Sequence, residues 1–201
     1  MIATNPARRG ISSRLYTLIF IIYTPTFMFF GNLHIVEEGR VYRTGRLPVK
    51  KFEETVERLK IRSLFRVICL HRGNREYFKM LDLVCEKRGI RQFVVSLTHN
   101  RIPDKQRLAA ILEVFDKAEY PLLIMCWRGA DRSGLTSALY KMYKNYRRDE
   151  VMGELSLFPY GHLWFLHLRY HIFLKGIYDH FGGNLQQYLN SDKTFTQKGS
   201  L

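Results

Sequence analysis

The chain is organised around one run of residues, Met125-Cys126-Trp127-Arg128-Gly129-Ala130-Asp131-Arg132-Ser133-Gly134. The apolar residues 122–125 predict a short buried strand, and residues 135–146 carry apolar side chains at helical spacing. The residues between them therefore form a strand-to-helix turn. The tip of that turn is the first place to look for chemistry.

The composition of this turn suits it to bind an anion. The loop from Cys126 to Arg132 contains Gly129, so its N–H groups can converge ahead of the helix that begins near Ser133. Unpaired N–H groups at the positive end of a helix make an anion site. That site would favour the thiolate form of Cys126, a nucleophile. Because Arg132 can lay a planar guanidinium across two oxygens of a tetrahedral dianion, the expected ligand is a phosphate monoester.

The spacing Cys-x-x-Gly-x-x-Arg-Ser-Gly resembles the signature of the cysteine-based protein tyrosine and dual-specificity phosphatases. The resemblance implies that Cys126 is the nucleophile, that Arg132 stabilises the transferring phosphoryl group, and that Ser133 hydrogen-bonds to the sulfur when it leaves. It also implies a phosphate-binding loop made of Trp127, Arg128, Gly129, Ala130, Asp131 and Arg132. Met125 departs from the family pattern, which has a histidine that tunes the thiolate.

A second similarity lies far from this loop. Residues 32–48 resemble the opening of bacterial phosphatases of the same superfamily, with an Asn-Leu-His strand and a Tyr-Arg-Thr-Gly turn. Two short apolar stretches around Glu38-Gly39 predict a hairpin there. This match extends the resemblance over residues 32–165. Arg43 and Arg46 could approach the substrate, but a solvated basic face is the favoured interpretation of both.

Strand and helix patterns alternate along the rest of the chain. Strands are expected at 65–70, 91–97 and 122–125, and helices at 49–60, 76–88, 104–118 and 135–146. This order predicts an α/β fold with a central, mostly parallel sheet flanked by helices, like a protein tyrosine phosphatase of dual-specificity size. The loops 71–75, 98–104 and 126–132 should face one site. Arg72 and His99 are the accessory residues expected in the first two.

The proton donor for the leaving group has two main candidates. Asp131 lies inside the loop, and Cys-x-x-Gly-x-Asp-Arg resembles bacterial phosphatases whose acid is thought to lie in the phosphate loop. Asp104 follows Ile102-Pro103, which is similar to a segment before the cysteine in related inositol-phosphate phosphatases. An aspartate that opens a helix is also stabilised by the helix dipole alone. His99 is a third possibility, and the choice stays open.

The composition fits one domain of 201 residues, with 46% hydrophobic residues. A net charge of +14 favours anionic partners, either a phosphorylated protein or a phospholipid. The basic residues form no nucleic-acid motif, so no nucleic-acid partner is expected. Cys69, Cys85 and Cys126 have neither metal-ligand nor disulfide spacing, and we expect no metal and no cofactor. The oligomeric state stays open.

Three regions are expected along the chain: an N-terminal basic stretch with a hydrophobic segment (1–31), a phosphatase domain (32–190) and a flexible tail (191–201). The uncharged run 15–33 predicts a membrane anchor, with the catalytic domain on the non-cytoplasmic side. A cleaved export signal and a helix packed on a soluble domain are the alternatives. The aromatic segment 157–174 predicts a core-covering helix, or else one that lies against a bilayer.

These observations predict a cysteine-dependent phosphomonoesterase that acts through a cysteinyl-phosphate intermediate. A membrane-associated lipid phosphatase, acting on phosphatidylglycerophosphate or a phosphoinositide, is the first alternative. An inactive phosphate-binding module is the second.

Overall fold

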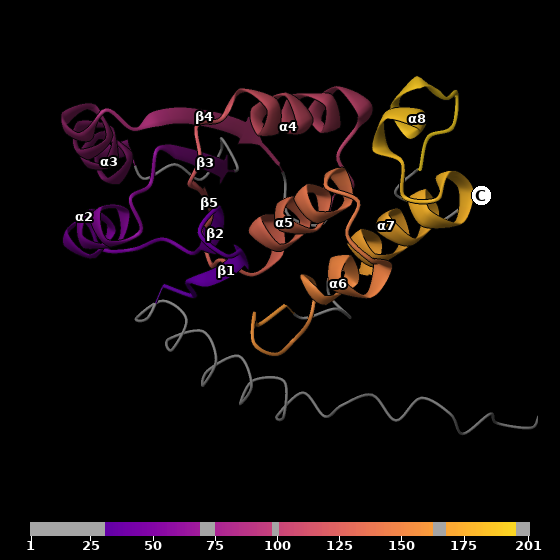
Figure 1. The fold of residues 1–201 in the computed structure, drawn as a ribbon, viewed down its shortest axis with the longest axis horizontal. Coiled ribbons are helices and arrows are strands. Elements are labelled where there is room, and N and C mark those ends of the chain that lie inside the picture. Colours follow the sequence, from indigo (N-terminus) through magenta and orange to yellow (C-terminus); the bar gives the residue numbers. More distant parts are fainter. Residues whose placement is uncertain (1–30, 69–74, 98–100, 163–167, 196–201) are drawn as a thin grey trace, which may run out of the picture.

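The computed structural model describes residues 31–68, 75–97, 101–162 and 168–195 (Figure 1). Its centre is a five-stranded sheet in the order β1-β2-β5-β3-β4. The strands are β1 (His34–Glu37), β2 (Val41–Thr44), β3 (Ser63–Ile68), β4 (Arg91–Ser96) and β5 (Leu122–Met125). β1 and β2 form the predicted antiparallel hairpin, and every other neighbouring pair is parallel. The predicted α/β fold with a mostly parallel sheet is confirmed.

Helices cover both faces of the sheet, because the side chains of each strand alternate between two cores. In β5, Leu123 and Met125 join the core beneath α2 (Val49–Arg58) and α3 (Arg75–Arg88). Leu122 and Ile124 join the larger core on the opposite face. The helices of that face are α4 (Lys105–Lys117), α5 (Asp131–Tyr143), α6 (Arg148–Gly153), α7 (Leu168–Phe181) and α8 (Leu185–Asn190).

The predicted helix over 157–174 is wrong in its first part. Residues 157–162 form an irregular turn, and the described helix α7 begins only at Leu168. Two local features explain the difference. Pro159 has no N–H to donate, and Gly161 has a left-handed φ of +70°. The segment is therefore free to turn back toward the phosphate loop instead of continuing along α7.

Two predictions concern the ends of the chain. The proposed anchor at 15–33 lies outside the described residues except for 31–33. Within the described ranges, none of the helices combines the length and the apolar character that crossing a bilayer requires. Of the tail expected at 191–201, residues 191–195 are described, and the ring of Phe195 stacks on Tyr188 with centroids 5.2 Å apart.

Candidate active site

The loop 126–130 joins β5 to α5, as the sequence predicted. In the sheet, β5 lies between β2 and β3. The parallel register pairs Thr44 with Met125, so the end of β2 lies beside the start of the loop. Met125 is 2% exposed and packs in the core beneath α2 and α3. Cys126 is 5% exposed, whereas Trp127 beside it is 42% exposed. The cysteine is therefore recessed, with an aromatic ring at the surface next to it.

Four consecutive carbonyl groups of the loop accept hydrogen bonds from residues 32–46. The N–H of Arg46 donates to the oxygen of Trp127 at 3.1 Å. The Nδ2 of Asn32 donates to the oxygen of Arg128 at 3.1 Å. The Nη2 of Arg43 donates to the oxygens of Gly129 and Ala130 at 2.9 and 2.8 Å. The outer side of the loop is thus bound along its whole length.

This arrangement sets the direction of the loop amides. In a trans peptide unit the N–H points opposite to the C=O, so the amides of residues 128–131 face away from residues 32–46. One of these amides shows the direction directly, because the N–H of Gly129 donates to Sγ of Cys126 at 3.2 Å. The Oγ of Ser133 lies 3.2 Å from the same sulfur. The sulfur therefore lies on the side of the loop toward which the amides point, at the N-terminus of α5, an arrangement suited to an oxyanion.

The turn of the loop requires glycine at position 129. Gly129 has a φ of +72°, which side chains disfavour. A Cβ added there would lie 2.5 Å from the backbone nitrogen of Gly45 and 2.8 Å from the carbonyl carbon of Thr44. The loop and the end of β2 thus touch backbone to backbone.

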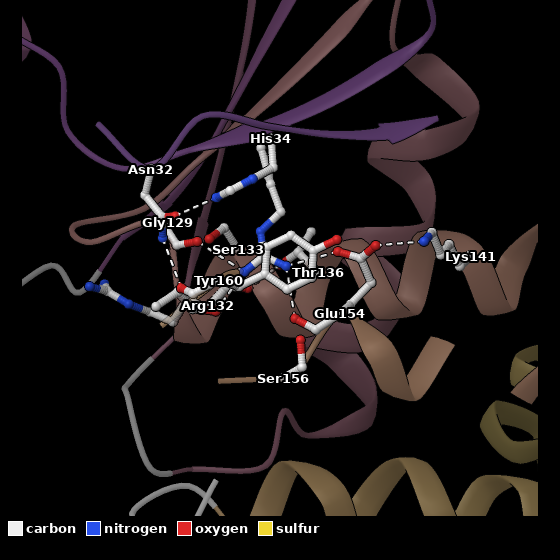
Figure 2. A network of polar contacts seen from close by, with 12 residues as sticks. Asn32, His34, Gly129, Arg132, Ser133, Thr136, Lys141, Glu154, Ser156 and Tyr160 are labelled. Atoms are coloured by element: carbon white, nitrogen blue, oxygen red, sulfur yellow. Dashed lines mark hydrogen bonds and ion pairs between the residues drawn. The ribbon is translucent and has the colours of Figure 1, made fainter. Parts of the chain in front are cut away.

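A buried ion cluster supports the loop from behind. Arg43 and Glu154 are both completely buried, and Nη1 of Arg43 donates to the carboxylate and to the main-chain oxygen of Glu154, both at 2.8 Å. The second carboxylate oxygen of Glu154 pairs with Nζ of Lys141 on α5 at 2.6 Å (Figure 2). The guanidinium also lies 4.2 Å from the centre of the Tyr160 ring. The interpretation of Arg43 as a solvated residue is therefore wrong, because both faces of β2 are covered.

Asn32 connects the loop to the turn at 157–162. Its Nδ2 donates to the oxygen of Tyr160 at 2.9 Å as well as to that of Arg128. Its Oδ1 therefore faces Nε2 of His34, 2.6 Å away, and this nitrogen must carry the hydrogen (Figure 2). Burial first, and the charge of Arg43 second, lower the pKa of His34. A neutral His34 with its hydrogen on Nε2 thus orients Asn32.

The two aspartates proposed as proton donors have different surroundings. Asp131 is the first residue of α5 and is 8% exposed; Oδ2 lies 2.9 Å from Nη2 of Arg128, and Oδ1 lies 3.0 Å from Nδ1 of His162. Asp104 caps α4. It accepts a hydrogen bond from the backbone N–H of Arg107 at 2.8 Å and forms an ion pair with the guanidinium of the same arginine. The side chain of Asp104 is half exposed. Only Asp131 is therefore built into the phosphate loop.

The mouth of the site carries one further cation. Arg46 lies over the rings of Tyr77 and Trp127, with its guanidinium carbon 3.8 and 5.0 Å from their centres. Arg46 is partly exposed, and the structure adds contacts with two aromatic rings to the solvated face that the sequence predicted. The arrangement joins α3, the end of β2 and the phosphate loop.

The structure brings together Cys126, Gly129 and Ser133, and it places Arg132 half-buried in the first turn of α5. Arg72 and His99 lie outside the described residues. Sequence reasoning missed Asn32 and His162, which contact the loop from distant parts of the sequence, and Glu154, which acts on it through Arg43. The sequence signal that pointed to a buried polar cluster here is Arg43, an arginine inside the short strand 41–44. Within the described ranges, no group of three His, Cys, Asp or Glu side chains is arranged to hold a metal ion.

Comparison with known proteins shows which solved structures share this fold. No profile of a known protein family matches the sequence, and no curated protein sequence matches it. Among solved structures, TpbA of P. aeruginosa gives a TM-score of 0.59 at 15% identity, covering 80% of this chain and 92% of TpbA. The catalytic core of the PP-IP phosphatase Siw14 of S. cerevisiae gives 0.55 at 23% identity, with 76% and 93% covered. Tk-PTP in its active form gives 0.55 at 18% identity, with 75% and 98% covered.

These similarities extend over most of the chain, and they show that its fold is that of the protein tyrosine and dual-specificity phosphatases. The predicted resemblance is confirmed at this level.

Proposed function

We propose that this protein is a cysteine-dependent phosphomonoesterase. The thiolate of Cys126 attacks phosphorus, the loop amides and Arg132 bind the equatorial oxygens, and Asp131 protonates the oxygen of the leaving group. A sulfur–phosphorus bond forms as the bond from phosphorus to the leaving oxygen breaks. Water then hydrolyses the cysteinyl phosphate, and Ser133 donates a hydrogen bond to the departing sulfur.

The observation that carries the proposal is the inward direction of the loop amides around the sulfur. Four loop carbonyls are bound from outside, and the N–H of Gly129 points at Sγ of Cys126. Donors held in this way need no reorganisation when charge develops on the phosphoryl oxygens. A cysteine that was only a core residue would not need these donors.

The test compares two buried cysteines. Cys126→Ser should abolish hydrolysis of 4-nitrophenyl phosphate, and the variant should still bind vanadate or phosphate. The matched control is Cys85→Ser on α3, which should retain full turnover because Cys85 packs beneath α2 and α3. Alkylation at pH 6 should label Cys126 and spare Cys85, since burial raises the pKa of the Cys85 thiol to about 11. Full turnover by Cys126→Ser would overturn the proposal.

The substrate class favoured by the mouth of the site is an aryl phosphate such as phosphotyrosine. The exposed ring of Trp127 adjoins the nucleophile, and Arg46 lies beside it. An aromatic leaving group can stack on such a ring, whereas a lipid phosphate cannot. Trp127→Ala should therefore raise KM for a phosphotyrosine peptide more than for phosphatidylglycerophosphate or a phosphoinositide in vesicles. The reverse order would favour the lipid phosphatase.

A second function, phosphate binding without turnover, is favoured by one observation. Both oxygens of Asp131 and the carboxylate of Asp104 already have partners, so neither aspartate is an uncommitted acid. A protein of this kind would bind phosphate in the loop and release the ester unchanged. Absence of a burst and of turnover with every aryl phosphate, in protein that binds vanadate, would select this alternative.

A further inference from the structure

Two of the groups that hold the carboxylate of Asp131 differ in their access to solvent. The side chain of Arg128 is 25% exposed and belongs to the phosphate loop itself, whereas the side chain of His162 is completely buried and comes from the turn after α6. A guanidinium can form two parallel hydrogen bonds to a phosphate dianion as well as to a carboxylate. When substrate binds, Arg128 is therefore the partner that can leave Asp131, and His162 is the one that stays.

The imidazole of His162 is fixed by its own segment. The N–H of His162 donates to the oxygen of Ser156 at 3.2 Å, and the N–H of Gly161 donates to the oxygen of Leu157 at 2.6 Å. Two side chains of α7 face the ring: Tyr170, with centroids 6.4 Å apart, and His171, with centroids 5.4 Å apart. Burial lowers the pKa of His171, and the charge of His162 adds to that effect.

We propose that His162 is the positioning residue for the proton donor, Asp131. The Nδ1–H of the imidazole donates to Oδ1 and keeps the carboxyl group at the start of α5 after Arg128 has turned to the phosphate. Oδ2 then carries the proton that the leaving oxygen takes, and the water that attacks the cysteinyl phosphate returns a proton to it. This inference rests on the proposed phosphatase function, and it assigns a role to the irregular turn at 157–162.

The role predicts a dependence on the leaving group. A phenolate needs protonation, because phenols of the tyrosine type have a pKa of about 10, whereas the more acidic 4-nitrophenol leaves with little help. Loss of a positioned acid should therefore lower kcat for phenyl phosphate by about 100-fold or more, whereas kcat for 4-nitrophenyl phosphate should fall only a few-fold. Damage to the fold would slow both substrates equally.

Three substitutions of His162 test whether its role depends on the hydrogen-bond donor at Nδ1 or only on filling the core. His162→Asn places an amide nitrogen near the position of Nδ1 and should keep phenyl phosphate turnover within about 10-fold of the wild type. His162→Gln places its donor farther out, and His162→Ala has none, so both should show the selective loss. Asp131→Asn should show the same selectivity. The matched control is His171→Asn, which contacts the His162 ring but not Asp131 and should leave both substrates unchanged.

The measurements are kcat with the two esters and inhibition by vanadate, in the full-length protein. Unchanged vanadate inhibition in the His162 variants shows that the loop is intact. Equal loss on both esters, or no rescue by His162→Asn relative to His162→Gln, would overturn the positioning role. Turnover that survives in Cys126→Ser would instead overturn the phosphatase proposal itself, so the two failures are distinguishable.

Discussion

Arg43 and Arg88 each bind acidic side chains from another element, but they differ in their access to water. Arg43 is completely buried with Glu154, and Lys141 completes the cluster. Arg88 joins α3 to Glu53 and Glu57 of α2 at 3.1 and 3.0 Å, and all three side chains are partly exposed. A buried ion pair is costly to break because one partner is left charged in a poor solvent. An exposed ion pair contributes little, because each charge exchanges contacts with water for a partner whose attraction is screened by solvent.

The comparison shows which of the two arginines supports the loop of the candidate site. The hydrogen bonds of Arg43 end on the loop carbonyls, so the buried cluster fixes the phosphate loop. The ion pairs of Arg88 link two helices on the far side of the sheet from α5. Similar residue types thus hold the loop of the candidate site in one place and link two helices in the other.

The largest expected effect is that of Arg43→Met. The substitution leaves the oxygens of Gly129 and Ala130 without their donor and Glu154 with Lys141 alone, so the free energy of unfolding should fall by about 3–5 kcal/mol. Turnover should be lost with it. Urea unfolding measures the change, and Arg43→Lys, which keeps the charge without the forked donors, should recover only part of the stability. A loss below about 1 kcal/mol would remove the distinction between the two clusters.

The next effect compares two glycines of positive φ. Gly39 has a φ of +67° and nothing within 4 Å of an added Cβ, so Gly39→Ala should cost about 1–2 kcal/mol from backbone strain alone. Gly129→Ala adds the contact with the backbone of Gly45, and it should also lower kcat by about 100-fold because the amides turn away from the phosphate. Equal stability and equal kcat in the two variants would show that the loop can relax independently of β2.

A smaller effect is expected for Arg88→Ala. The free energy of unfolding should change little at low salt, and the difference should vanish at high salt, because screening already weakens exposed pairs. The kcat should not change. Unfolding curves with and without added sodium chloride provide the measurement, and a loss as large as that of Arg43→Met would contradict the comparison.

The smallest effect concerns His34, which reports on the charge of Arg43. Its pKa is lowered from 6.5 by burial and then by Arg43. The unfolded chain therefore binds more protons than the folded one just below pH 6.5, and stability should fall as the pH drops through that range. His34→Gln should flatten this slope. In an Arg43→Lys background, where burial and charge are both kept, NMR titration should find the pKa of His34 still lowered, and a return to 6.5 would contradict the assignment of the shift to burial and charge.

The sequence by itself determined the elements whose signals are local. The run from β5 through the loop into α5 is contiguous, so the spacing of Cys126, Gly129 and Arg132 predicted a strand-to-helix loop suited to an anion without a structure. Two short apolar stretches around Glu38-Gly39 predicted the hairpin. The alternation of strand and helix patterns along the chain predicted the mostly parallel sheet. The segment 157–174 misled the prediction, since apolar spacing does not register the turn imposed by Pro159 and Gly161.

Only the tertiary structure decided which residues support the loop. The hydrogen bonds of Arg43 to Gly129 and to Glu154 span 86 and 111 residues of sequence, and that of Asn32 to Arg128 spans 96. Contacts at such separations leave no periodic trace in the chain. Arg43 was expected to be solvated, because a charged side chain is ordinarily exposed. It is buried because Glu154, Tyr160 and the loop cover the face of β2 from which it projects, and its charge is stabilised there because Glu154 and the loop carbonyls converge on it.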